Sequence, residues 1–202
     1  MRRRPNSRRE FREIARTKLF RLFEEEVELP NGEIRMFEFV ERSPGVRALM
    51  FQSHHLLINR EWRSEFNSWD WRLPGGRVFE SIEEYDTARK SSSDLSDLNR
   101  RAVSREVREE TGVVTDPSEW SFFATSVAGA TIRWDLHYFS THTDRIPLTY
   151  HWKAPETAEE QTETFWKSFD EIHRIIESGE MREDRSVVQT LKFLASSASQ
   201  TL

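Results

Sequence analysis

The 202-residue sequence predicts a mixed α/β domain that carries a β-hairpin extension at its N-terminus. Three observations support this fold class. Strand-like and helix-like runs alternate along most of the chain, which is the order expected for helices packed on a mixed sheet. A hydrophobic content of 36% is enough for one sizeable core. Near the N-terminus, two apolar runs flank a strong turn signal, which indicates an extra hairpin.

Residues 1–18 are predicted to form a basic tail followed by a short helix. The first nine residues are rich in arginine but lack the apolar segment of a secretion signal. From about Arg9, apolar residues recur at the spacing of a helix face, beginning with Phe11 and Ile14. Two interpretations of the tail stay open: a frayed terminus, or a segment that contacts nucleic acid or steers anionic substrates.

Residues 19–42 are predicted to form the hairpin. Two strand-like runs, 19–28 and 34–41, flank the turn-forming residues Pro30-Asn31-Gly32. A two-stranded hairpin is at best marginally stable by itself. We therefore expect it to pack on the main body or on a second subunit, where it would act as a dimerisation element.

Residues 43–197 are predicted to form the main domain. Apolar clusters at 46–51 and 56–58 predict two adjacent strands joined by a short turn. Residues 71–76 then lead into a loop. The polar, serine-rich segment 82–95 is interpreted as an insertion.

The second half of the chain alternates between strands and helices. A helix is predicted from about Asp97 to Thr111, because Gly112 occupies a position where helices commonly end in a left-handed residue. Ser168 begins another helix, which Gly179 ends. Further elements are predicted from apolar patterning: strands at 120–127, 131–140 and 162–167, and a final helix at 185–195.

Composition excludes several classes of function. The absence of cysteine excludes disulfides and thiolate metal sites. The net charge is only −5 with both signs interspersed, so no general affinity for nucleic acid or membranes follows. No apolar run approaches the roughly 18 residues that span a bilayer. We therefore expect a cytoplasmic protein with no membrane partner, and we do not expect nucleic acid as a partner.

The most informative stretch runs from Arg105 to Val113 and reads REVREETGV. Glu106, Glu109 and Glu110 recur at helical i, i+3 and i+4 spacing, so they share one face with no neutralising charge between them. Such pairs destabilise a helix by about 0.2–0.5 kcal/mol each, which a bound hard cation would offset. Magnesium takes oxygen ligands and binds together with substrate phosphates. The run thus indicates metal-assisted phosphate chemistry; taken alone, it also fits a solvated acidic face.

With the preceding glycine pair, this run resembles the signature of the Nudix hydrolases. The second half of that signature, Arg-Glu-apolar-any-Glu-Glu-any-Gly-apolar, is matched in full from Arg105 to Val113. The first half departs from it, because the sixth residue after Gly76 is Ile82 instead of glutamate. The resemblance implies a Nudix-type α-β-α sandwich with a mixed central sheet, extended by the N-terminal hairpin.

The glutamate missing from the first half needs a stand-in. The eighth residue before Arg105 is Asp97, which fits if segment 82–95 is looped out before it. Glu83 and Glu84 fit this position less well. The other interpretation of Asp97 is a helix N-cap, a position that aspartate favours.

Around the signature, the chain looks most like the ADP-ribose pyrophosphatase branch of this family. Glu61-Trp62-Arg63 stands where that branch has Gln-Tyr-Arg, and residues 72–76 stand where it has Glu-Leu-Pro-Ala/Gly-Gly. The implied reaction is metal-dependent hydrolysis of ADP-ribose to AMP and ribose 5-phosphate. Residues 126–133 lack the branch's Ser-Pro-Gly run, which leaves the substrate open. One alternative is a nucleoside triphosphate or RNA-cap pyrophosphohydrolase, which the basic N-terminus would support. The other is a nucleotide sensor without turnover, which the Asp97 replacement and the insertion would mark.

The resemblance also implies site residues. Glu106, Glu109 and Glu110 would act in catalysis and hold Mg²⁺ or Mn²⁺, with the Gly75 carbonyl and Asp97 as further metal ligands. A late acidic loop would supply the base that activates water. Glu160, and next to it Glu159, are the candidates for this base; solvent-facing charges are the alternative interpretation of that loop.

Arg63, Gly76 and Arg105 are the candidate substrate-binding residues. Arg63 can bind a phosphate with two hydrogen bonds, or can belong to a surface ion pair. Glycine lets the backbone approach a phosphate closely, although the pair Gly75-Gly76 also fits an ordinary tight turn. Arg105 is predicted to organise the site by pairing with Asp97 or with a loop carbonyl. The expected partners are a nucleoside diphosphate derivative and a second copy of the chain.

Overall fold

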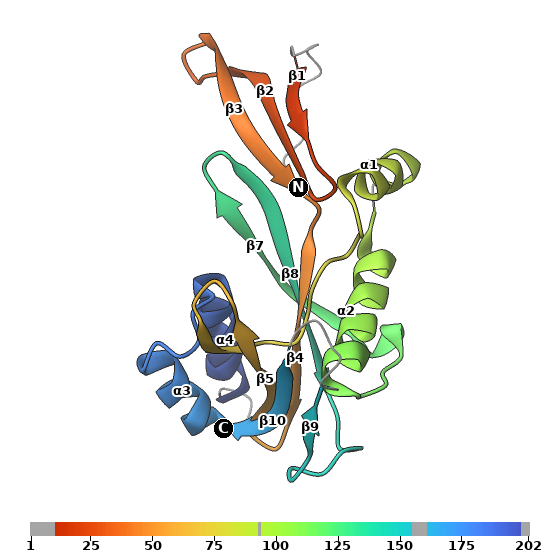
Figure 1. Cartoon of the computed structure of the whole chain (residues 1–202), viewed down its shortest axis with the longest axis vertical. Coiled ribbons are helices and arrows are strands. Elements are labelled where there is room, and N and C mark those ends of the chain that lie inside the picture. The colour runs from red at the N-terminus through yellow and green to blue at the C-terminus, as the bar shows by residue number, and fades with distance from the viewer. Residues whose placement is uncertain (1–10, 93, 155–160, 199–202) are drawn as a thin grey trace. The chain divides into compact units, whose positions relative to one another are not determined.

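The computed structural model describes most of the chain, namely residues 11–92, 94–154 and 161–198. The chain divides into two compact units (Figure 1). The hairpin unit comprises the N-terminal residues up to Pro44 together with segments 79–93 and 127–135. The main unit comprises segments 45–78, 94–126 and 136–202.

The N-terminal hairpin is present as the sequence predicts. Strands β2 (Phe20–Glu28) and β3 (Ile34–Arg42) pair antiparallel over their whole length. Gly32 in the connecting turn has a φ of 81°, a left-handed conformation that glycine adopts without steric cost. Within the same unit, the first residues of β8 pair parallel with β3, so that Val40 lies opposite Ile132.

The predicted short helix near the N-terminus is wrong. Phe11–Arg16 forms strand β1, which pairs antiparallel with β2. The register shifts between Glu13 and Ala15, so the apolar spacing that suggested a helix face comes from an irregular strand. A short isolated helix is marginal in water. Pairing with β2 offers backbone hydrogen bonds and a ring contact between Phe11 and Phe23, with centroids 4.8 Å apart.

The segment interpreted as an insertion contains a helix, α1 (Ile82–Ser91), which belongs to the hairpin unit. Ser81 caps this helix, because its hydroxyl accepts a hydrogen bond from the Glu84 N–H at 3.1 Å. Asp86 pairs with Arg21 of β2 at 3.0 Å. The Ser-x-x-Glu spacing is a helix-start signal that the sequence contains, so this helix could have been predicted.

The main unit is built on a mixed sheet. Its strand order is β8-β4-β5-β10-β9, with β6 beside β5 and β7 beside β8. Strand β4 runs parallel to β8 and antiparallel to β5. The strands are β4 (Gly45–Gln52), β5 (His55–Arg63), β6 (Ser68–Arg72), β7 (Ser121–Gly129), β8 (Ile132–His142), β9 (His151–Lys153) and β10 (Thr162–Ser168). The sequence did not predict β6 and β9.

Helices cover both faces of this sheet (Figure 1). Helix α2 (Ser96–Thr111) packs against β4 and β10. On the other face, α3 (Phe169–Glu177) packs against β5 and β10, and α4 (Asp184–Ala198) packs against α3. This arrangement confirms the predicted α-β-α sandwich with a mixed sheet. No helix in the described part of the chain is both long and apolar enough to cross a membrane.

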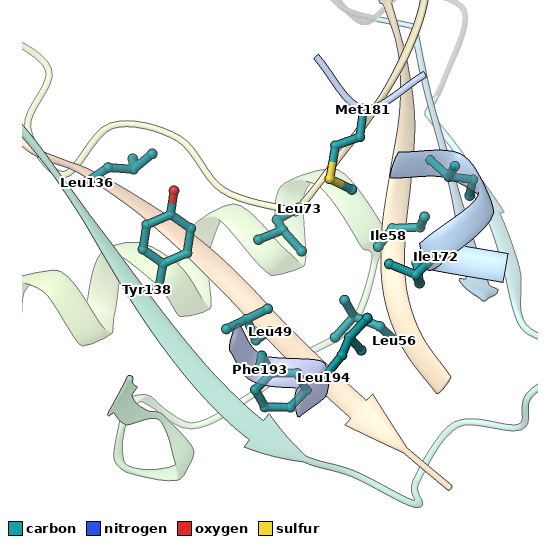
Figure 2. Packing of buried hydrophobic residues seen from close by; sticks show 11 residues of the cluster. Leu49, Leu56, Ile58, Leu73, Leu136, Tyr138, Ile172, Met181, Phe193 and Leu194 are labelled. Carbon is teal, nitrogen blue, oxygen red and sulfur yellow. The ribbon is translucent and has the colours of Figure 1, made fainter. Parts of the chain in front are cut away.

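The main core lies between the sheet and helices α3 and α4 (Figure 2). Leu49 of β4 and Ile58 of β5 face Ile172 of α3 and Phe193 of α4, and all four are nearly inaccessible to solvent. Each such side chain contributes about 1.5–3 kcal/mol of burial free energy. Because side chains alternate along a strand, Asn59 points from β5 to the opposite face. There it meets α2, which carries the signature carboxylates.

Candidate active site

Helix α2 holds the signature carboxylates against the loop at residues 74–76. Its buried side chains Ala102, Val103 and Val107 anchor it to the sheet. Gly112 ends the helix with a φ of 70°, as predicted, and its N–H donates to the carbonyl of Arg108. With the helix fixed in this way, the orientation of each glutamate follows from its position on the helix.

Glu110 is the most enclosed of the three glutamates. Its Oε2 accepts hydrogen bonds from the Gly75 N–H at 2.8 Å and from Asn59 Nδ2 at 2.9 Å. Burial, followed by repulsion from Glu61 and Glu106, raises the pKa of Glu110 well above its ordinary value. Attraction from Arg47 lowers the pKa of Glu110 in part but does not outweigh burial and the repulsion from the two neighbouring carboxylates.

Glu106 lies beside the second glycine of the loop. A Cβ atom at Gly76 would come within 2.3 Å of Glu106 Oε2, so only glycine fits there without moving the carboxylate. Burial raises the pKa of Glu106 above its ordinary value, although Arg105 lowers it in part. Glu106 and Glu110 thus form a partly buried acidic pair that faces the glycine loop.

The expectation of three carboxylates without a countercharge is wrong. Arg105 Nη2 donates to Glu106 Oε1 at 2.8 Å, and Arg105 Nε lies 3.9 Å from Glu109. Glu109 also lies 3.9 Å from Arg108, and its side chain is 53% exposed. Glu109, three residues after Glu106, lies about 60° short of a full turn from it. It therefore turns toward the arginines, away from the buried pair.

Two further residues of the site were not predicted to act there. Glu61 on β5 is 5% exposed and repels Glu110 electrostatically. Its carboxylate lies 3.7 Å from Arg63 and 3.8 Å from Arg72. Asn59, also on β5, binds Glu110 directly. In the sequence, polar residues at alternate positions directly follow the apolar run 56–58, and this pattern could have indicated that both side chains belong to the site.

The glycine loop is fastened to strand β4. The N–H groups of Val46 and Ala48 donate to the carbonyls of Gly76 and Pro74, at 2.9 and 2.8 Å. Gly75 has a φ of 144°, and a Cβ atom there would lie 2.2 Å from the Val46 carbonyl oxygen. Backbone approach this close requires glycine.

The Gly75 carbonyl, predicted to be a metal ligand, already accepts a hydrogen bond from Arg47 Nη1 at 2.8 Å. A carbonyl oxygen has a second lone pair, so it can still bind a cation. Arg47 is held in turn by Glu183, through contacts of 2.9 and 3.0 Å to the two carboxylate oxygens. An ion pair thus positions the loop, and no local pattern indicates this long-range partner.

Asp97 is not assembled with the other candidate ligands. Leu95, not Asp97, is the N-cap of α2, so the N-cap interpretation is wrong. The Asp97 side chain is 87% exposed and pairs with Arg100 at 3.2 Å. Nine residues of helix separate it from Glu106, about 13 Å along the axis. One ion cannot bind both side chains at that distance, so a shared metal ligand role for Asp97 is also wrong.

The predicted substrate-binding arginines have partners within the chain. Arg105 donates to the carbonyl of Arg77 in the loop at 2.6 Å. Of its two predicted partners, Asp97 and a loop carbonyl, it therefore has the second. Arg63 binds Glu65 with contacts of 2.8 and 2.6 Å. A substrate phosphate would have to displace that carboxylate. Glu159 and Glu160, the candidate bases, lie outside the described residues.

Comparison with known proteins places this site in a family. The NUDIX domain profile matches residues 41–190, which include the glycine loop and the whole of α2. The chain belongs to the Nudix family. A solved structure titled "Crystal structure of ADP compounds hydrolase" is similar to it, with a TM-score of 0.64 and 19% identity over 95% of this chain and 92% of that chain. Among curated proteins, no significant match was found.

The acidic pair of this Nudix domain suits a divalent cation. Within the described ranges, no three acidic, histidine or cysteine side chains converge as a closed metal site. Magnesium, however, usually binds through one or two carboxylates and keeps water or phosphate oxygens in its other positions. Glu106 and Glu110 are partly buried, Glu106 repels Glu110, and both have raised pKa values. They would hold the cation together with the Gly75 carbonyl, with Glu109 nearby.

Acid should destabilise this Nudix domain through Glu183. Burial raises the pKa of Glu183, but attraction and hydrogen bonding from Arg47 outweigh it and lower the pKa to about 2. The folded pKa lies below the unfolded one, so the stabilisation is complete above about pH 4.5 and disappears as the pH falls toward 2. It amounts to about 3 kcal/mol. Urea unfolding between pH 6 and pH 3 should show a steeper loss for the wild type than for Glu183→Gln; equal slopes would contradict the assignment.

Proposed function

We propose that this Nudix protein hydrolyses the pyrophosphate bond of a nucleoside diphosphate linked to another group, with ADP-ribose as its principal substrate. The observation that carries the proposal is the buried pair of Glu106 and Glu110 against the loop at Gly75-Gly76, inside the Nudix signature. The similarity of fold to a protein titled ADP compounds hydrolase supports this class of substrate.

The reaction adds water across the phosphoanhydride. A water oxygen attacks one phosphorus, the bond from that phosphorus to the bridging oxygen breaks, and the bridging oxygen leaves with the other phosphate. From ADP-ribose the products are AMP and ribose 5-phosphate. A bound divalent cation would offset the negative charge of the diphosphate and lower the pKa of a coordinated water.

The chain's own residues supply position and charge. Glu106 and Glu110 would hold the cation, and Asn59 with the Gly75 N–H fixes Glu110 in one orientation. Arg105 ties α2 to the loop through the Arg77 carbonyl. Arg63 would bind a phosphate after leaving Glu65. Glu160 or Glu159 remains the proposed base that takes a proton from the attacking water.

The experiment is a substrate panel assayed with the full chain and Mg²⁺ or Mn²⁺. It should include ADP-ribose, a UDP-sugar, ATP and a capped RNA, with products separated by chromatography. We expect AMP from ADP-ribose as the fastest reaction. Faster release of diphosphate from ATP, or faster decapping, would assign the function to those substrates. Binding of ADP-ribose without turnover of any compound would identify a nucleotide sensor instead.

Gly75→Ala should lower ADP-ribose hydrolysis by about 100-fold, because the added Cβ would push the loop off the Val46 carbonyl and displace the groups beside Glu110. Gly179→Ala is the matched control. Gly179 also has a left-handed φ, of 74°, but nothing lies within 4 Å of its Cβ position. Steady-state kinetics should show near wild-type activity for the control. Equal losses in both variants would mean that backbone strain alone, without displacement of the loop, explains the effect.

We also propose a homodimer formed through the hairpin unit. Ile34 and Met36 on β3 are 62% and 46% exposed and lie on the same face of the strand. Exposed apolar groups of this kind mark interaction surfaces. Sedimentation at micromolar concentration should give a dimer for the wild type and a monomer for Ile34→Asp/Met36→Asp. Val188→Asp, at an exposed site on α4, should stay dimeric; a monomeric wild type would refute the proposal.

A further inference from the structure

A cationic groove runs along α2 on the flank away from the acidic pair. Two adjoining cavities form it, with volumes of about 970 and 230 Å³, and they share Arg101 and Pro117. Side chains of α2 form one wall, and the segment from Val114 to Phe122 forms the other. Arg101 lies about 140° around the helix from Glu106 and about half a turn from Glu110. The groove is therefore distinct from the candidate metal site.

Arginines line the helix wall of this groove. Arg101, Arg105 and Arg108 follow i, i+4, i+7 spacing and so share one face of α2. Within the described part of the chain, Arg101 makes no hydrogen bond or ion pair. The Arg108 side chain is 62% exposed, and its carboxylate contact, to Glu109, is as long as 3.9 Å. Two guanidinium groups in the groove are thus available to a ligand.

The two aspartates that line the groove do not pair with Arg101 or Arg108. Asp97 pairs with Arg100. Asp116 turns toward its own backbone, where it accepts hydrogen bonds from the N–H and hydroxyl of Ser118 at 2.8 and 2.6 Å. Glu119 pairs with Arg145. The lining of the groove contains four arginines and two aspartates, so it keeps a local excess of positive charge, although the whole chain is acidic.

We propose that this groove binds a linear chain of three or more phosphates. The planar guanidinium group matches phosphate with two parallel hydrogen bonds. Arg101 and Arg108 are seven residues apart, about 10 Å along the helix axis. A short polyphosphate can extend along the helix and bond to both guanidinium groups, and it offers more oxygen atoms to them than a single phosphate does. This binding requires neither the metal nor turnover, so it stands apart from the proposed hydrolysis.

Two sources could supply such a chain: inorganic polyphosphate, or the phosphate tail of a nucleotide. The Phe122 ring lines the larger cavity and is 57% exposed. An exposed aromatic ring provides a face on which a nucleobase can stack. If a nucleoside triphosphate binds more tightly than tripolyphosphate, and Phe122→Ala removes that difference, the ligand is the nucleotide. If the two affinities are equal, the ligand is the inorganic chain.

The test is calorimetric titration of the full chain with tripolyphosphate, ATP and orthophosphate in EDTA at low salt. Tripolyphosphate should bind the wild type, orthophosphate should bind far more weakly, and added salt should reduce the affinity. Arg101→Glu/Arg108→Glu should lose at least about tenfold in affinity. Arg174→Glu/Lys192→Glu is the matched control, because it makes the same change in net charge at exposed positions on α3 and α4.

Several results would overturn the proposal. They are an absence of tripolyphosphate binding to the wild type, unchanged affinity in the groove variant, or an equal loss in the control variant. Thermal unfolding of each variant checks the fold, and Arg101→Gln/Arg108→Gln replaces the charge reversal if that variant is unfolded. Hydrolysis of ADP-ribose, measured on the same preparations with Mg²⁺, reports on the proposed function separately from the groove.

Discussion

Glu110→Gln should abolish ADP-ribose hydrolysis without unfolding the protein. We expect kcat/KM to fall by about 10³-fold, which corresponds to about 4 kcal/mol of lost transition-state stabilisation. The amide oxygen can still accept the hydrogen bonds from Gly75 and Asn59. It cannot, however, supply the negative charge that holds a divalent cation. Quenched time-course assays of AMP release measure the loss of activity. Thermal unfolding of the metal-free protein measures the effect on stability.

The unfolding measurement separates this variant from ordinary structural damage. Glu110 is buried close to Glu61 and Glu106, so its negative charge is unfavourable in the metal-free protein. Replacing it with a neutral side chain of the same shape should leave the melting temperature unchanged or raise it. A lower melting temperature would mean that the carboxylate stabilises the fold and that loss of activity cannot be assigned to the metal.

Glu109→Gln tests whether the cation is held by two glutamates, Glu106 and Glu110, or by all three. Glu109 is half exposed and lies beside Arg105 and Arg108 instead of facing the glycine loop. We expect a loss of about tenfold, similar to that of a group that orients a metal ligand. A loss as large as that of Glu110→Gln would show that Glu109 turns inward to bind the cation. The buried pair would then be an incomplete description of the site.

The parts of the site that could be predicted are local in sequence. Helix spacing places Glu106 and Glu110 one turn apart, and Gly112 ends the helix where a left-handed residue was expected. The same spacing did not reveal that Arg105 would bind Glu106, because the choice between neighbouring rotamers depends on the Arg77 carbonyl, 28 residues earlier. Local periodicity therefore identified which side chains share a face but not their ion pairs.

Residues brought together by the sheet were harder to predict. Glu61 and Asn59 meet α2 because β5 lies beside β10 and turns its alternate side chains toward that helix. Strand pairing also overrode local pattern at the N-terminus, where β1 adds to β2 although its apolar spacing resembles that of a helix. In both places the partner strand decides the outcome, and the local sequence contains no information about the pairing.

The ion pair between Arg47 and Glu183 joins residues 136 positions apart in the sequence, and breaking it on one side should strongly destabilise the main unit. Glu183→Ala leaves the Arg47 guanidinium, which is 8% exposed, without its carboxylate. We expect the free energy of unfolding to fall by about 3–5 kcal/mol, the usual cost of breaking a buried pair on one side. Urea denaturation at pH 7 measures this loss. A change below about 1 kcal/mol would mean that the pair is solvated and energetically weak.

The double variant Arg47→Met/Glu183→Leu tests whether the ion pair stabilises the fold or positions the glycine loop. Replacing both charges with apolar side chains of similar volume often restores stability, because the desolvation cost disappears together with the attraction. We therefore expect most of the lost unfolding free energy to return. Hydrolysis should stay about 10- to 100-fold below the wild type, because the Gly75 carbonyl has lost the guanidinium that positions it. If activity recovered together with stability, Arg47 would stabilise the fold without positioning the loop; if stability stayed low while activity returned, the buried pair would matter to folding alone.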